Sequence, residues 1–229
     1  MNTLDVLAII EGNNKEIDSF SFHSFPQQKL VQEQVVEWGE LDQKHFDLAM
    51  DVRNELHLPF WDAVMVTAFN NPSYSQQILR AALHHNHPQS VFFIKSKDIQ
   101  SLLLNCKERI AVCSSVVMKN KQIKHIPMLD FHIPVCDVNL KIVECVCRIL
   151  NLGAGYILNS GESYHFISSS IVSWDELYSI LSKALRFCPI IDRAWISHQL
   201  EEKSCSLRVD KKNGVEPIVV KVIDEETVK

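Results

Sequence analysis

Six polar side chains alternate with apolar residues on three short segments in the C-terminal half of the chain. Residues two apart in an extended strand point to the same face of a sheet. The alternation therefore predicts one polar face that carries Asp130 and His132, Ser163 and His165, and Ser206 and Arg208. Carboxylate and imidazole groups can bind a divalent cation, and Arg with a second His can hold an anion such as a triphosphate. Phosphoryl or nucleotidyl transfer needs mainly such charge neutralisation and positioning.

The elements that must position these side chains follow one another in a recognisable order. Gly161-Glu162 separates two strand-like runs and predicts a hairpin. Ser173 with Glu176 predicts a capping box at a helix start. The predicted elements are a strand at 126–133, a helix at 137–152, strands at 156–160 and 163–168, a helix at 173–187, a short helix through His198, and a strand at 204–209.

This β-α-β-β-α-β order predicts an α+β fold of the split βαβ type, as in RRM and ferredoxin-like domains. The expected sheet order, 4-1-3-2, places the strand at 126–133 between those at 163–168 and 204–209. The helix predicted at 137–152 begins at Asp137 and has apolar residues at helical spacing, namely Val138, Ile142, Cys145, Ile149 and Leu152.

The first 125 residues predict an α/β N-terminal half with few chemical signals. Its predicted elements are a strand at 4–10, helices at 41–56, 75–85 and 98–106, and strands at 91–94 and 110–118. We expect residues 1–229 to form a single compact unit. Within it, 1–125 form the α/β half and 126–223 form the RRM-like half that carries the site.

Composition narrows the class of protein. The chain has 229 residues, of which 46% are hydrophobic and 22% charged, and a formal net charge of −5. No apolar run is long enough to span a bilayer, and the seven cysteines include no C-x-x-C pair. We expect a cytoplasmic protein without a membrane segment, with reduced thiols and no overall basic field for nucleic acid.

Four segments together resemble the catalytic module of the archaeo-eukaryotic primase (primase–polymerase) superfamily. They are Met128-Leu-Asp-Phe-His132, Ser160-Gly-Glu-Ser-Tyr-His-Phe166, Ile191-Asp192 and Ser206-Leu-Arg208. The family has an Asp-x-Asp metal motif, a Ser-Gly-x-x-x-His nucleotide motif and a later apolar-Asp motif. The match covers roughly residues 125 to 210, and its Ser-Gly-x-x-x-His portion is the most specific piece.

The resemblance implies a role for each matched residue. Asp130, His132 and Asp192 would be catalytic and would bind Mg²⁺ or Mn²⁺, whereas Ser160, Gly161, Ser163, His165 and Arg208 would bind the nucleotide. One position departs from the pattern, because His132 stands where the family has its second acid. The substitution removes one negative charge from a site expected to hold two cations beside a triphosphate.

Three functions follow from these observations. The first is a nucleotidyltransferase that uses nucleoside triphosphates and a divalent metal on a nucleic-acid template, expected to be single-stranded. The second is a catalytically degenerate primase-like subunit that binds nucleotide or nucleic acid for a protein partner. An RNA-recognition domain ranks last, because the open face carries Asp, His and Arg rather than aromatic residues for base stacking.

Overall fold

The computed structural model describes residues 1–25, 43–58, 60–68, 90–95, 98, 109–211 and 214–224. The predicted helix at 75–85 and nearly all of that at 98–106 lie outside the described residues. No described helix combines the length and apolar character that crossing a membrane requires.

The contacts group the chain into two compact units. One consists of Met1–Phe25 with Pro88–Lys229, and the other is Pro26–His87. In the second unit, α3 (Gln43–Leu56) and α4 (Phe60–Ala68) share a small apolar core, with Phe46, Ala49, Val64 and Ala68 buried. This grouping cuts the chain at positions other than 125. The expected single unit with halves 1–125 and 126–223 stays a prediction.

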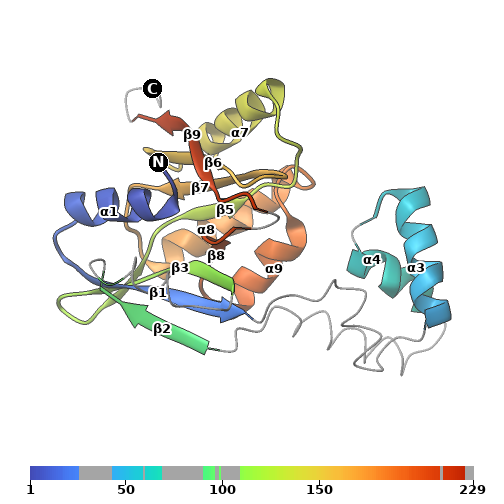
Figure 1. The fold of residues 1–229 in the computed structure, drawn as a ribbon, viewed down its shortest axis with the longest axis horizontal. Coiled ribbons are helices and arrows are strands. Elements are labelled where there is room, and N and C mark those ends of the chain that lie inside the picture. Colours follow the sequence, from blue (N-terminus) through green and yellow to red (C-terminus); the bar gives the residue numbers. More distant parts are fainter. Residues whose placement is uncertain are drawn as a thin grey trace. The chain divides into compact units, whose positions relative to one another are not determined.

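The larger unit holds the remaining elements. In chain order these are α1 (Thr3–Asn13), β1 (Ile17–Phe25), β2 (Ser90–Ile94), β3 (Arg109–Met118), β4 (Ile123–His125), β5 (Met128–Asp130), α7 (Asp137–Ile149), β6 (Gly155–Asn159), β7 (Tyr164–Ser168), α8 (Trp174–Ala184), η1 (Leu185–Phe187), α9 (Arg193–Glu202), β8 (Ser206–Arg208) and β9 (Ile218–Ile223). Antiparallel sheets accompanied by helices make the fold α+β (Figure 1).

Two antiparallel sheets form the framework. One has the order β2-β1-β3-β4, with β8 also paired to β3, and the other has the order β5-β7-β6-β9. β4 and β8 share one edge of β3, because β8 pairs with residues 111–113 and β4 with residues 115–117. The predicted hairpin is present as β6 and β7, with Asn159 opposite Tyr164 at its closed end.

The prediction that β5 lies between β7 and β8 is wrong for β8. β7 lies beside it as expected, but β8 pairs with β3 in the other sheet. The segment 190–192 takes the expected place of β8, since Ile191 bridges Phe131 at the end of β5. Alternation along a three-residue strand indicates which side chains share a face, but it does not select the edge to which the strand pairs.

The predicted strand at 4–10 is also wrong, because these residues belong to helix α1. The side chain of Asn2 accepts hydrogen bonds from the amides of Leu4 and Asp5, at 3.0 and 3.1 Å. The carboxylate of Asp5 accepts one from the Asn2 amide in return, at 2.8 Å. This capping box satisfies amides that the first turn of a helix otherwise leaves without partners, so the apolar run starts a helix.

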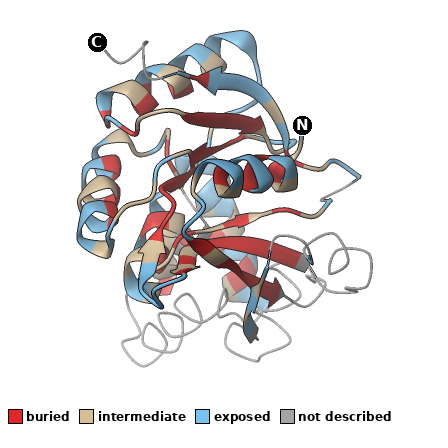
Figure 2. Cartoon of the chain, turned by 90° about the vertical axis from the view of Figure 1, so that its left-hand side faces the viewer, coloured by how far each residue is buried: buried red, intermediate tan, exposed pale blue. Residues whose placement is uncertain are grey.

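The core lies between the sheets and the helices that cover them. All five residues of β7 are buried, as are the first four of β6 (Figure 2). α8 has the predicted capping box of Ser173 and Glu176 and buries Leu177, Leu181 and Ala184. α7 buries Val143, Val146 and Cys147, whereas four of the five apolar positions named from its sequence spacing face outward.

Candidate functional site

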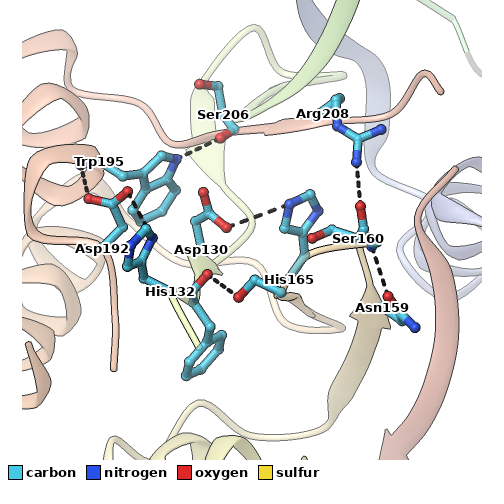
Figure 3. A network of polar contacts seen from close by, with 12 residues as sticks. Asp130, His132, Asn159, Ser160, His165, Asp192, Trp195, Ser206 and Arg208 are labelled. Carbon is cyan, nitrogen blue, oxygen red and sulfur yellow. Dashed lines mark hydrogen bonds and ion pairs between the residues drawn. The ribbon is translucent and has the colours of Figure 1, made fainter. Parts of the chain in front are cut away.

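The centre of the site is Asp130, at the end of β5, with a partner on either side. In the β5–β7 ladder Asp130 lies opposite His165. On the other side, the Asp192 amide donates to the Asp130 carbonyl oxygen at 3.1 Å, and the His132 amide donates to that of Ile190 at 2.7 Å. These bonds flank the Phe131–Ile191 bridge and set Asp192 opposite Asp130. The backbone therefore aligns His165, Asp130 and Asp192 as a row of cross-strand neighbours (Figure 3).

Each carboxylate in the row faces an imidazole. Nε2 of His165 lies 3.6 Å from Oδ1 of Asp130, and Nδ1 of His132 lies 3.9 Å from Oδ2 of Asp192. Asp192 is also the N-cap of α9, because its Oδ1 accepts a hydrogen bond from the Trp195 amide at 3.0 Å. The start of α9 thus fixes one carboxylate oxygen of Asp192 and leaves the other directed towards His132.

His165 is the buried member of the row, with 6% of its surface exposed. Burial, and secondarily the positive charge of Arg208, lowers the pKa of His165 to about 3, so its imidazole is neutral at physiological pH. Its contact with Asp130 is consequently an approach between a neutral ring and a carboxylate. Within the described part of the chain, Nδ1 of His165 is buried and has no hydrogen-bond partner.

The hairpin between β6 and β7 brings Ser160 and Gly161 close to the row. The Ser160 amide donates to the Ser163 carbonyl oxygen at 2.9 Å, and the Gly161 amide donates to Oδ1 of Asn159 at 2.8 Å. Gly161 has a φ of +104°, and a Cβ at this position would approach Val215 to 3.3 Å. Both observations explain why glycine occupies this turn.

Ser163 and Arg208 fasten this hairpin to its surroundings. The Ser163 hydroxyl donates to the Phe131 carbonyl oxygen and accepts from the Ile133 amide at 3.2 Å. The guanidinium of Arg208 donates to the carbonyl oxygens of Ser160, at 2.6 Å, and of Val215, at 3.3 Å. It also donates to the Asp210 carbonyl oxygen. Both predicted nucleotide-binding side chains thus help to hold the loop that carries Ser160 and Gly161.

Sequence reasoning missed the residues that position Asp192. Nε1 of Trp195 donates to the Ser206 carbonyl oxygen at 2.9 Å, and the Ser206 amide donates to Oε1 of Gln199 at 2.6 Å. These bonds fasten α9, and therefore its N-cap, to β8. An indole in a helix is usually a packing residue, and Gln199 has no feature in the sequence that distinguishes it from a surface residue.

The predicted metal ligands suit a divalent cation by their chemistry. Asp130 and Asp192 lie opposite each other in the backbone pairing. Two charged carboxylates in such positions repel each other, and a bound cation would relieve this repulsion. Oxygen donors of this kind are those that Mg²⁺ and Mn²⁺ prefer. As the side chains lie, however, the described residues contain no group of three or more His, Cys, Asp or Glu arranged to hold a metal ion.

Comparison with protein families finds one family whose model matches more than half of the chain. Residues 77–220 match the archaeo-eukaryotic primase 1D-like family. The chain therefore belongs to this primase-like family, and the matched range includes every residue of the candidate site. No curated protein and no solved structure matches the chain.

Proposed function

We propose that this protein is a primase–polymerase-like nucleotidyltransferase that uses nucleoside triphosphates on a single-stranded nucleic-acid template. The observation that carries the proposal is the row of His165, Asp130 and Asp192 beside the Ser160–Gly161 hairpin. The family assignment agrees with it, since primase-like proteins bind nucleotides and nucleic acids. The strand order β5-β7-β6 supports the finer assignment of a split βαβ core, because it is the 1-3-2 order of that motif.

The chain's own residues divide the work along the row. Asp130 and Asp192, with His132, are the side chains that would hold Mg²⁺ or Mn²⁺. Such a cation would neutralise triphosphate charge and align the leaving group. His165 is neutral, so it can donate one hydrogen bond to a phosphate oxygen without adding charge. Ser160 and Gly161 sit on a turn whose shape Arg208 maintains, which keeps the nucleotide side of the site in place.

The decisive experiment is a gel assay with labelled nucleoside triphosphates, a single-stranded template and Mn²⁺ or Mg²⁺. We expect template-dependent product from the natural protein and a loss of at least about 100-fold in Asp130→Ala, because positioning and charge neutralisation supply most of this catalysis. Asp175→Ala is the matched control, since Asp175 is an exposed acid on α8. Circular dichroism checks that both variants are folded. An Asp130→Ala protein that forms as much template-dependent product as the natural protein would contradict the catalytic role of Asp130.

A second function has an observation of its own. His132 replaces the family's second acid, its side chain is 74% exposed, and the described residues contain no ready three-ligand group. These facts favour a degenerate subunit that binds nucleotide or nucleic acid for a partner. A folded protein that makes no product in either metal but binds a fluorescent nucleoside triphosphate, with binding lost in Asp130→Ala, would establish this second function instead.

A further inference from the structure

Helix α7 carries an apolar stripe on its solvent side. Val138 is 67% exposed and Ile149 is 63% exposed, and Ile142, at 36%, and Cys145 lie between them on the same side. Their spacing is four, three and four residues, which places all four side chains along one line of a helix. Figure 1 shows α7 on the outer side of the four-stranded sheet, next to β6 and β9.

The stripe is separate from the face that α7 buries in the protein. The buried residues Val143, Val146 and Cys147 lie farther around the helix, with Val146 at the edge of the stripe, and join the main core. α7 thus has two apolar faces, and only one of them is buried in the core of the protein. Contiguous exposed apolar surface of this kind is typical of sites that bind another macromolecule.

The geometry of the stripe specifies the shape of its occupant. Alternating steps of three and four residues are the a and d spacing of a coiled-coil seam. From Val138 to Ile149 the seam extends about 16 Å along the helix axis, which is three turns. A single straight apolar row of this length fits one partner helix lying along α7, with its own apolar residues between those of the stripe.

The charges beside the stripe specify the chemistry of that helix. Lys141 and Arg148 are seven residues apart, so both border the stripe on the same flank. The acids Asp137 and Glu144 lie on the same flank but farther from the stripe, and Glu144 pairs with Arg148 and lies 3.9 Å from Lys221, so the charged groups next to the stripe are basic. The opposite flank passes into the core at Val146. Among the described residues of α7, a partner helix therefore meets charge along one edge, where the nearest groups are Lys141 and Arg148.

We propose that the α7 stripe binds an amphipathic helix of a partner protein, one with an aliphatic seam and an acidic flank that faces Lys141 and Arg148. A second copy of this chain is a poorer fit. Antiparallel association about a two-fold axis would bring the two basic flanks together, and their like charges would repel each other. The proposal does not depend on whether the Asp130 site catalyses a reaction.

Two designed peptides test the proposal. Each has three heptads with Leu at positions a and d, and carries either Glu or Lys at positions e and g together with a fluorescent label. Binding to the full-length protein is followed by fluorescence anisotropy, and gain of helix by circular dichroism. We expect the Glu peptide to bind at least about tenfold more tightly than the Lys peptide, because each close charge pair contributes to specificity as well as affinity.

Variants separate the apolar part of the site from its charged part. Val138→Gln/Ile149→Gln should weaken binding of the Glu peptide about tenfold or more, since it removes two apolar side chains from the seam. Ile123→Gln is the matched control, because Ile123 on β4 is 61% exposed and lies outside the stripe. Lys141→Glu should reduce or reverse the preference between the peptides. These substitutions affect exposed side chains, and thermal unfolding confirms that the proteins are folded.

Three results would overturn the proposal. Absence of binding by the Glu peptide at up to about 0.1 mM, which corresponds to no more than weak affinity, would remove the site. Equal binding of both peptides would contradict the acidic partner. Sedimentation that shows a dimer of the natural protein, abolished by Val138→Gln/Ile149→Gln, would assign the stripe to a second copy.

Discussion

The two ends of the candidate site contain the same pair of groups in opposite surroundings. At one end His165 lies 3.6 Å from Asp130, and its side chain is 7% exposed. At the other, His132 lies 3.9 Å from Asp192, and its side chain is 74% exposed. The two distances differ by only 0.3 Å, so the two pairs differ mainly in how far they are exposed to solvent. Packing fixes the buried end, whereas the exposed end is open to a ligand.

The buried end also has a cost for the fold. His165 is buried and neutral, with one ring nitrogen that lacks a partner in the described structure. A buried polar atom without a hydrogen bond typically costs about 1–3 kcal/mol. A role in binding or catalysis is one reason for a fold to keep such a group. The comparison therefore predicts that changes at the two ends affect stability and function differently.

The largest expected effect is from His165→Leu. Leu removes the unpartnered Nδ1 and keeps a side chain of similar size, so we expect an unfolding free energy equal to or above that of the natural protein. Nucleotide affinity should fall about tenfold or more, because the buried hydrogen-bond donor is lost. Urea unfolding and a fluorescent-nucleotide titration measure the two effects. A stability loss of several kcal/mol with unchanged affinity would show that His165 serves the fold alone.

The next effect is a pH dependence that belongs to His165. Its pKa is about 3 in the folded protein and near 6.5 in a model compound, so between these values only the unfolded chain binds the proton. The contribution of His165 to the free energy of unfolding is therefore fully present above about pH 6.5. It falls as the pH decreases, by at most about 1.4 kcal/mol per pH unit. Between pH 7 and pH 5, we expect the natural protein to lose about 2 kcal/mol more than His165→Leu.

The comparison with this variant isolates one histidine among several. Burial also lowers the pKa values of His125 and His198, so both add slopes of the same sign. These slopes are common to the natural protein and the variant, and they cancel in the difference. Urea titrations of both proteins at the two pH values provide the test. Parallel losses in the two proteins would contradict the burial of a neutral His165.

The sequence predicts the buried end better than it predicts its surroundings. Alternation in β5 and β7 put Asp130 and His165 on one face, and the ladder confirms that they are opposite each other. The hairpin was predictable because Gly161 interrupts two alternating runs. The place of Asp192 beside Asp130 is set by the segment 190–192, which is too short to show a period of its own.

The errors have two physical causes, one local and one long-range. The apolar run at 4–10 suits either a strand or a helix, and the local capping by Asn2 and Asp5 decides it. Alternation in β8 identifies a strand, but long-range packing assigns it to β3. The apolar residues of α7 predict a helix correctly, but with two apolar faces the period alone does not show which one meets the core. In the last two cases contacts distant in sequence settle the structure, and local patterns carry no record of them.

The smallest expected effect on stability is at the exposed end, in His132→Asp. Surface groups contribute little, so the unfolding free energy should change by less than about 0.5 kcal/mol. Function should respond more, because the substitution restores the second acid of the family's metal motif beside Asp130 and Asp192. We expect product formation to rise about threefold or more, or the preferred cation to shift between Mn²⁺ and Mg²⁺.

The assay is nucleotide incorporation over a range of each metal, with His57→Asp as the control, since His57 is an exposed histidine in the other unit. Equal rates and metal dependence in His132→Asp and the natural protein would place position 132 outside the reacting site, and would leave Asp130 and Asp192 as its only acids among those proposed.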